Sequence, residues 1–337
     1  MTTAALIARI IHQMKRDRRT LALLFLAPLF VLTLMYFIFN SDDSKPTIVT
    51  TNIPNSLVEK MEQQALLIEK EPFSIAKLKE EQYDAWLRFE QGNITLTLLN
   101  DEPSLAKQIQ FMMTNALQSD PAQDKNLTVH YVYGDKDTAL FDIFSPMLIG
   151  FFVFFFVFLI SGIALLKERT SGTLERLLAT PIRRFEIVFG YLIGYGLFAL
   201  VQTIVIVLYG VYVLDIVHVG SIWLVIFINV VVALVSLSLG TLLSSFASSE
   251  FQMMQFIPLV IVPQVFFSSI FPLNSMAEWL QYIGKTMPLY YAADALNGVM
   301  YKGSTFAEIW LNLIILIGFA VVFILLNIVS LKKYRIL

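Results

Sequence analysis

The residue types that could act on a partner gather in one charged segment, 167–186, which reads KERTSGTLERLLATPIRRFE. The runs on either side of it, 150–166 and 187–213, contain no Asp, Glu, Lys or Arg. A charged side chain at the centre of a bilayer costs about 2.5–3.5 kcal/mol even on a lenient insertion scale. The apolar runs are therefore predicted to span a membrane. The charged segment is predicted to lie at the membrane face, where a soluble partner could push on it.

The spacing within this segment predicts a short amphipathic helix. Leu174, Leu177 and Leu178 fall at i, i+3 and i+4, which places them on one apolar stripe. Pro181 then ends that turn. The side chains predicted to couple this segment to a partner are Glu168, Arg169, Leu174, Glu175, Arg176, Leu177, Leu178, Arg183 and Arg184. For Arg183 and Arg184, an equally good interpretation is that they anchor the next span to lipid headgroups.

Catalytic and metal chemistry find no support in the residue pattern. His12, His130 and His218 are scattered, there is no HExxH motif, and the chain has no cysteine. The triplet 284–286, Gly-Lys-Thr, resembles the end of a P-loop, but Trp279 stands where that pattern requires Gly. We therefore predict no catalytic, cofactor or metal site, and we expect no ATP hydrolysis by this chain and no nucleic-acid partner.

Composition predicts a membrane protein. Hydrophobic residues make up 57% of the chain and charged residues 15%, against about 45–50% and 25% in ordinary soluble domains. Six runs are long enough to cross roughly 30 Å of hydrocarbon: 20–39, 146–166, 187–213, 221–246, 251–271 and 309–331. The predicted fold is an α-helical polytopic membrane protein with six transmembrane helices and an inserted α/β extracytoplasmic domain at 40–145.

Basic residues near the span ends predict the orientation. Five lie at the N-terminus, five in 167–186 and three at the C-terminus, whereas the opposite short connections carry only Lys285 and Lys302. Because cytoplasmic connections carry the excess of Lys and Arg, both termini are predicted to be cytoplasmic, with a tail at 332–337. Residues 1–19 are predicted to form an interfacial amphipathic helix, since Leu6, Ile7, Ile10 and Ile11 share one face. We expect a multi-pass protein of a bacterial plasma membrane.

The predicted outer domain is acidic, with nine Lys and Arg against seventeen Asp and Glu in 40–145. Alternating β-branched residues predict strands at 47–53, 94–99 and 127–133. Helical character at 56–69, 77–90 and 103–118 completes an α/β subdomain. Its surface charge is explained most simply by solubility.

Two groups of residues are candidates for a substrate path. Gln252 and Gln255 begin a span that also contains Pro258 and Pro263, which suggests bends. The segment 272–306 is apolar but too short to span a membrane. Its residues Tyr290, Tyr291 and Asp294 could line an exit. The two tyrosines fit an interfacial aromatic belt at least as well, and Asp294 is the acid of this stretch expected to be buried.

The whole chain resembles the permease subunit of a type-2 ABC exporter, in the subgroup with a large extracellular domain between spans one and two. Residues 168–181, ERTSGTLERLLATP, are similar to that family's cytoplasmic stretch, with its GTLE, LL and TP elements. Residues 287–291, MPLYY, followed by Gly303, resemble its outer segment. The resemblance implies that 272–306 forms short helices that dip back into the outer leaflet. The chain departs from the family pattern at Tyr191, where a Gly-Lys pair is frequent.

The resemblance implies a mechanism and partners. Two permease copies, or two related permeases, would pair, and each would contact a cytoplasmic ABC ATPase through 167–186 and the N-terminal helix. ATP and Mg²⁺ would be bound by that ATPase, and this chain would bind no cofactor. The cargo would be a lipophilic or amphipathic compound such as a drug, an antimicrobial or a lipid.

Three other classes of function compete with this interpretation. Ion-coupled secondary transporters usually place charges inside their spans, and the six runs have none in their cores. A membrane sensor that reads ligands through its outer domain would normally continue into a signalling domain, and only 332–337 follow the last run. A membrane-bound enzyme would need a catalytic constellation. An ATPase or a kinase encoded nearby would separate exporter from sensor.

Overall fold

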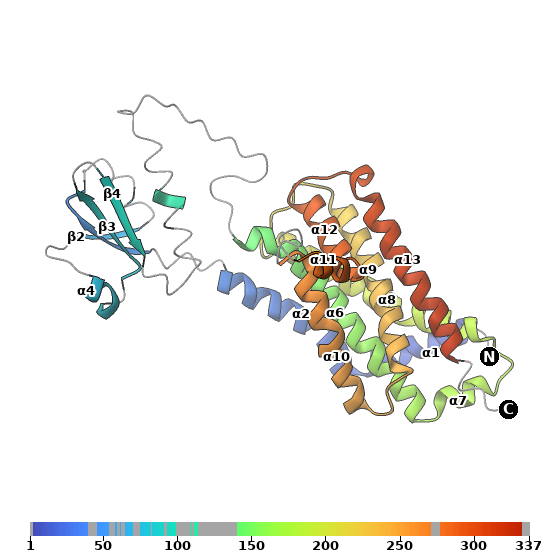
Figure 1. The fold of residues 1–337 in the computed structure, drawn as a ribbon. Coiled ribbons are helices and arrows are strands. Elements are labelled where there is room, and N and C mark those ends of the chain that lie inside the picture. Colours follow the sequence, from blue (N-terminus) through green and yellow to red (C-terminus); the bar gives the residue numbers. More distant parts are fainter. Residues whose placement is uncertain are drawn as a thin grey trace. The chain divides into compact units, whose positions relative to one another are not determined.

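The computed structural model describes residues 3–39, 46–53, 58, 61, 65–69, 75–81, 83–90, 93–98, 109, 111–113, 140–270 and 277–331. The chain divides into two compact units (Figure 1). One is formed by Met1–Asn40 and Tyr133–Leu337, and the other by Ser41–Val132. Each unit is described by itself.

The first unit is helical. Its elements in chain order are α1 (Thr3–Arg16), α2 (Arg18–Phe39), α6 (Leu140–Thr170), α7 (Thr173–Leu178), α8 (Arg184–Tyr212), α9 (Ile222–Ser244), α10 (Glu250–Val265), the π-helix η1 (Phe266–Ile270), α11 (Glu278–Gly284), α12 (Pro288–Met300) and α13 (Phe306–Ser330).

Six of these helices are long and apolar enough to cross a membrane, which confirms the predicted number of spans. They cover Arg18–Ile38, Phe144–Thr170, Arg184–Tyr212, Ile222–Ser244, Glu250–Ser268 and Phe306–Ser330. The second span differs from its predicted extent, because α6 continues through the charged residues 167–169 before it ends. The helix pairs the backbone polar groups of this stretch, and it fixes the direction of the first charged side chains.

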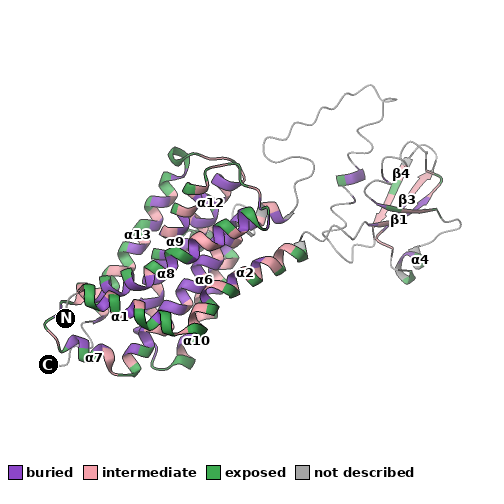
Figure 2. Ribbon diagram, turned by 180° about the vertical axis from the view of Figure 1, so that it is seen from behind, coloured by how far each residue is buried: buried purple, intermediate pink, exposed green. Residues whose placement is uncertain are grey.

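Helix α6 forms the centre of the helical unit. It packs against α2, α8, α9, α10 and α12, and buried residues line its length in Figure 2. Polar bonds add to this packing: Ser236 Oγ of α9 donates to the Phe154 carbonyl of α6, and Asn327 Nδ2 of α13 donates to the Ser238 carbonyl at 2.8 Å. Such interhelical bonds contribute about 0.6 kcal/mol each in membrane proteins.

Helix α12 runs antiparallel to α13. Asp294 accepts a hydrogen bond from Asn312, and one turn nearer the start of α12 the ring of Tyr291 lies 6.3 Å from that of Phe319. Helix α10 changes geometry after Pro263, where it passes into the π-helix η1. Proline removes a backbone donor, so a local change of helix type at this point is expected. The bends predicted from the two prolines of this span stay a prediction.

The second unit contains a four-stranded sheet of order β2-β1-β3-β4. Its strands are β1 (Thr47–Thr51), β2 (Leu66–Glu69), β3 (Ala85–Glu90) and β4 (Asn93–Leu98), and α4 spans Ile75–Glu80. β1 is parallel to both β2 and β3, and β3 pairs antiparallel with β4. Ile48, Ala85 and Leu87 face one core, with Val49 and Trp86 on the opposite face.

The predicted mixed α/β character of this unit is confirmed, and the predicted strands at 47–53 and 94–99 are present as β1 and β4. The helix predicted over 77–90 is wrong beyond α4, because β3 occupies its second half. The chain turns at Asp84, whose carboxylate accepts the Thr47 N–H at 2.7 Å and so starts the pairing with β1. The helix predicted over 56–69 is likewise replaced at its end by β2. Most of 103–118 and all of 127–133 lie outside the described residues.

Candidate functional site

The short helix α7 has the two faces that its sequence predicts. Gly172, with φ 69°, separates it from α6 in a backbone conformation that favours glycine. Leu174, Leu177 and Leu178 are buried, while Glu175 and Arg176 are exposed. The buried leucines pack into the main core of the helical unit. The exposed side of α7 is therefore a surface fixed to the bundle by its other side.

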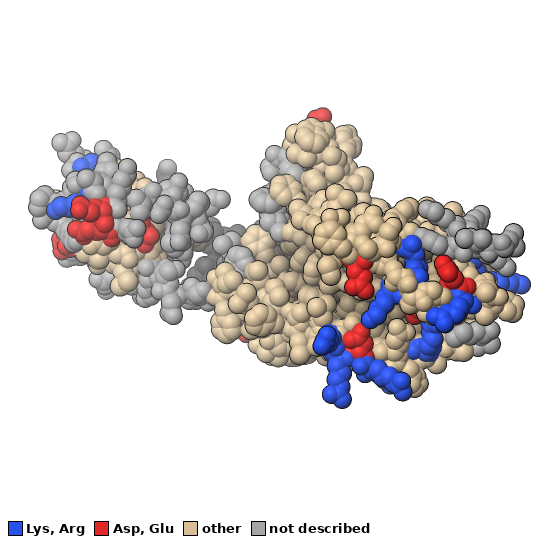
Figure 3. Space-filling model, turned by 90° about the horizontal axis from the view of Figure 1, so that it is seen from below, with Lys and Arg blue, Asp and Glu red and all other residues tan. Residues whose placement is uncertain are grey.

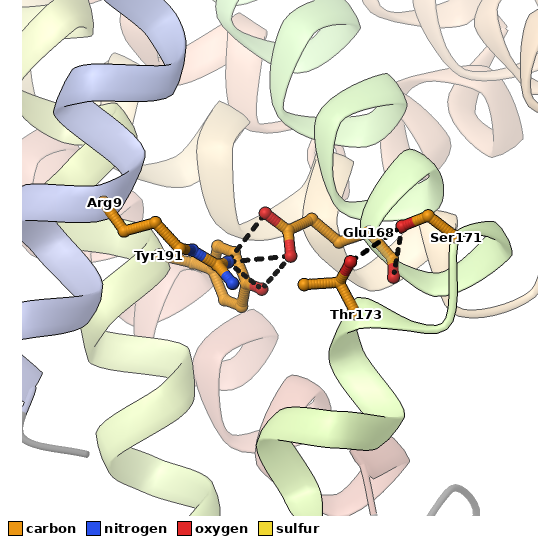
Figure 4. A network of polar contacts seen from close by, with 5 residues as sticks. All are labelled: Arg9, Glu168, Ser171, Thr173 and Tyr191. Atoms are coloured by element: carbon orange, nitrogen blue, oxygen red, sulfur yellow. Dashed lines mark hydrogen bonds and ion pairs between the residues drawn. The ribbon is translucent and has the colours of Figure 1, made fainter.

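A polar network joins the end of α6 to α1 and α8 (Figure 4). Glu168 is only 3% exposed, and Arg9 Nη2 donates to both of its carboxylate oxygens at 2.7 Å. The Tyr191 hydroxyl of α8 donates to the same carboxylate at 3.1 Å. Ser171 Oγ donates to the Glu168 carbonyl at 3.3 Å and lies 2.9 Å from Thr173 Oγ1. The network thus reaches the first residue of α7.

Nearby charges and burial shift the pKa of Arg9 in opposite directions. Partial burial lowers the pKa of Arg9, but the charges and hydrogen bonds of Glu168 and Tyr191 together raise it above its ordinary value. The guanidinium therefore stays charged, and it neutralises a carboxylate that would be costly to bury alone.

Two glycines of α8 receive the apolar side of α1. A Cβ on Gly190 would lie 2.5 Å from Leu6 Cδ2, and a Cβ on Gly194 would lie 2.9 Å from two methyl carbons of Ile10. Leu6 and Ile10 are fully buried, so the small residues allow the two helices to approach closely. The predicted amphipathic face of α1 exists, but its centre packs on α8.

Asp17 connects α1 to the first span. It is the residue directly before α2, and its carboxylate accepts hydrogen bonds from Thr20 N at 3.1 Å and Thr20 Oγ1 at 2.8 Å. These bonds satisfy a backbone N–H at the start of α2. The hydrogen bond from the Thr20 side chain is the main cause that lowers the pKa of Asp17.

The sequence also matches a known protein family. The profile described as ABC-2 family transporter protein matches residues 18–329. The chain belongs to this ABC-2 transporter family.

Individual relatives agree with the family assignment. Over 205 residues the chain is 27% identical to ABC transporter G family member 20 of Dictyostelium discoideum, which covers 60% of this chain and 28% of the relative. Over 169 residues it is 25% identical to the probable multidrug ABC transporter permease YbhR of Escherichia coli, covering 50% and 46%. Over 178 residues it is 29% identical to the inner membrane transport permease YhhJ of Escherichia coli, covering 52% and 47%. The matched parts thus span less than half the length of these relatives.

The predicted coupling residues of this ABC-2 chain occupy three different environments. Glu175, Arg176 and Arg183 are exposed. Glu168 faces Arg9 in the buried network. Arg169 donates to the Ser244 carbonyl and, at 3.0 Å, to the Ala247 carbonyl, so it holds the α9–α10 connection. Glu168 and Arg169 would therefore contribute to coupling by holding neighbouring helices together, and not by direct contact with a partner.

Arg184 and other charged residues lie at the end of the helical unit that carries α7. Arg184 is the first residue of α8 and is half-buried, and the Glu186 carboxylate accepts the Arg183 backbone N–H at 2.7 Å. Seen from below in Figure 3, Lys and Arg side chains gather here with acidic side chains between them. Among the described residues, the exposed cations of this end of the helical unit are Lys15, Arg16, Arg18, Arg19, Lys167, Arg176 and Arg183.

The predicted substrate-path residues do not form one site in the ABC-2 chain. Gln252 accepts the Ser248 backbone N–H at 2.7 Å and its own N–H is bonded to Ser249 Oγ, so it belongs to the N-cap of α10. Gln255 is exposed. Tyr290 and Tyr291 lie on α12, whose start contacts Gln264, and Gln264 is about 18 Å along α10 from Gln252.

The expectation that Asp294 is buried is wrong, because this residue of α12 is exposed. Sequence reasoning also missed Arg9, Tyr191, Gly190 and Gly194 as parts of the site. The spacing of the two glycines in an apolar helix is a G-x-x-x-G pattern, a known signal for close helix contact. For the pairing of Arg9 with Glu168 the sequence offers no comparable signal.

Proposed function

We propose that this ABC-2 chain is the membrane-spanning permease subunit of an ATP-driven exporter. It would work with a separate cytoplasmic ABC ATPase, which binds ATP and Mg²⁺, and with a second permease copy or a related permease. The chain itself would hydrolyse nothing. Its cargo would be a lipophilic or amphipathic compound, such as a drug, an antimicrobial or a lipid, moved out of a bacterial cell across the plasma membrane.

The main observation behind this proposal is how α7 packs on the helical unit. Its exposed Glu175 and Arg176 are held on a helix whose leucines are buried in the bundle core. The helix lies between α6 and α8, and Arg9 ties both of these to α1 through Glu168 and Tyr191. A push on α7 by a soluble partner would therefore move three helices together. That property suits the transmission of ATPase movement to the membrane domain.

The charge distribution supports the proposed orientation. The basic residues at α1, α2 and α7 lie at one end of the helical unit (Figure 3). Positive charge next to membrane spans favours the cytoplasmic side, which would place both termini and α7 where an ATPase could reach them. The relatives whose names describe permeases support the same role.

A pull-down with charge reversals tests the contact with the ATPase. The tagged chain is extracted from its own cells in mild detergent, and the ATPase activity that co-purifies with it is measured. The double variant E175R/R176E reverses two exposed charges of α7 and should remove most of the bound activity. Because Arg176 also donates to the Ser171 and Gly172 carbonyls, the single variant E175R is measured beside it and should weaken binding in the same direction. The variant E278R, which reverses an exposed charge on α11, serves as the matched control and should bind normally.

Two results would contradict the proposal. Full ATPase binding by E175R/R176E would show that α7 is not the contact surface. Absence of any co-purifying ATPase with the unmodified chain would favour an ion-coupled carrier or a sensor.

A further inference from the structure

Asp294 is an exposed carboxylate beside an apolar span. It lies on α12, and Asn312 Nδ2 of α13 donates to its Oδ2 at 2.8 Å. No Lys or Arg in the described part of the chain forms an ion pair with Asp294. An amide neutralises no charge, so the carboxylate keeps its attraction for a cation.

The position of Asn312 in its helix indicates the depth of this pair in a membrane. Helix α13 has 25 residues and is therefore about 37 Å long, somewhat more than the roughly 30 Å of hydrocarbon. Asn312 lies about 9 Å along the axis from Phe306, the first residue of the helix. With α13 across the bilayer, Asp294 and Asn312 lie near the boundary between hydrocarbon and headgroups.

Tyr290 lies near the carboxylate on the same helix, and the neighbouring helix α13 carries exposed apolar residues. Tyr290 is one helical turn before Asp294, and burial, together with the negative charge of Asp294, raises the pKa of the Tyr290 phenol. The rings of Tyr290 and Tyr291 meet edge to face at 5.1 Å. On α13, Trp310 and Leu311 are 50% and 54% exposed. A carboxylate with aromatic neighbours suits an ammonium group, and the exposed apolar residues suit an alkyl chain.

We propose that Asp294, with Asn312 and Tyr290, binds the ammonium group of an amphiphile. The alkyl chain of that amphiphile lies along the exposed apolar side of α13. The ammonium group belongs either to a phosphatidylethanolamine headgroup or to a cationic amphiphile that leaves the transporter. The binding itself rests on the geometry of α12 and α13, whereas a role in the release of cargo rests on the proposed export function.

Native mass spectrometry of the detergent-purified chain tests the binding without any ATPase. Phosphatidylethanolamine and dodecyltrimethylammonium are titrated separately, with phosphatidylglycerol as the headgroup that lacks an ammonium group. The variant D294N keeps the size of the side chain and its contact with Asn312 but removes the charge. The variant D294E restores the charge, and E278Q removes another exposed acid from α11 as a control.

We expect D294N to weaken the binding of at least one ammonium probe by about tenfold, or about 1.4 kcal/mol, because the variant removes the negative charge that attracts the ammonium group. D294E should bind like the original chain, E278Q should show no change, and phosphatidylglycerol should be insensitive to all three variants. Loss of phosphatidylethanolamine alone identifies a lipid site, and loss of dodecyltrimethylammonium identifies a cargo-type site. Equal binding of both probes by D294N and the original chain overturns the inference. Because no ATPase is present, failure of the proposed export function leaves this result unaffected.

Discussion

Arg9 Nη2 lies 2.7 Å from both carboxylate oxygens of Glu168, and this contact joins α1 to the last turn of α6 across 159 residues of chain. Glu168 is 3% exposed, whereas the Arg9 side chain is 29% exposed. The ion pair therefore joins a buried carboxylate to a guanidinium that is partly exposed to water. Tyr191 adds a third helix to the same carboxylate.

Removal of Arg9 alone should destabilise the helical unit more than removal of both charges. The variant R9Q leaves the buried Glu168 carboxylate without its cation, and we expect a loss of about 2 kcal/mol, less than for a fully buried pair because Arg9 is partly exposed. The double variant R9Q/E168Q should recover much of this loss. Thermal unfolding in detergent measures both variants, and losses that simply add would contradict a direct interaction.

The two glycines of α8 should differ in their tolerance of alanine. At Gly190 the new methyl group meets the flexible end of Leu6, whereas at Gly194 it meets the β-branched Ile10, whose Cβ lies only 3.0 Å away. We expect G194A to cost about 1–3 kcal/mol through overpacking, and G190A to cost less. Thermal unfolding of the variants gives the order of the two costs.

A matched control for the glycine variants is available in α13, because a Cβ on Gly318 would meet nothing within 4 Å. G318A should therefore leave the stability unchanged or slightly higher, since alanine favours the helix. In the double variant I10A/G194A the clash is removed, so the cost of G194A should fall. An equal cost for G318A and G194A would mean that α1 does not occupy the α8 surface.

Asp17 should make stability depend on pH in the acidic range. Hydrogen bonds from Thr20 lower its pKa in the folded chain, so its contribution is present above the unfolded pKa of about 3.9 and is lost as the pH falls through the folded value. At pH 7, D17A should cost about 1 kcal/mol, the usual effect of losing an N-cap. Thermal unfolding between pH 7 and pH 3 should show the difference between the two chains become smaller below about pH 3.9, the unfolded pKa.

The variant D17N separates the cap from the charge. Asparagine caps helices about as well as aspartate, so D17N should be close to the original chain at pH 7 and should lack its share of the pH dependence. If D17A unfolds at the same temperature as the original chain at pH 7, Asp17 does not hold the start of α2.

The elements of the helical unit could be predicted because each is encoded locally. Runs without charge predict the six spans, and the three leucines of α7 predict a helix with one buried side. The exposure of Glu175 follows from the same spacing. In contrast, the partners of Glu168 could not be predicted, since burial of that carboxylate depends on Arg9, a residue in a distant segment. Glu168 and Glu175 have the same type and lie seven positions apart, yet only the fold distinguishes their environments.

The outer unit shows the limit of local patterns more sharply. Residues 77–90 carry helix-forming residues at both ends of their range, and the prediction extended one helix across all of them. The structure ends α4 at Glu80 and begins β3 at Ala85, because strand pairing with β1 outweighs the weak intrinsic preference of this stretch. Asp84, which bonds the Thr47 N–H, marks the change only once the partner strand is known.

Gln264 offers a test of how the end of α10 holds α12. Its Oε1 accepts the Leu289 backbone N–H at 3.0 Å, and the residue is 4% exposed. The start of α12 has backbone donors without helical partners, and inside a membrane domain water is a poor substitute. Q264A should therefore cost about 1–3 kcal/mol, the penalty for leaving a buried donor unsatisfied together with lost packing.

Q255A changes an exposed glutamine of the same helix and should be neutral in thermal unfolding. The same pair of variants separates anchoring from a substrate path, because a transport defect in Q255A without loss of stability would favour a path along α10, whereas loss of stability in Q264A alone would favour an anchor.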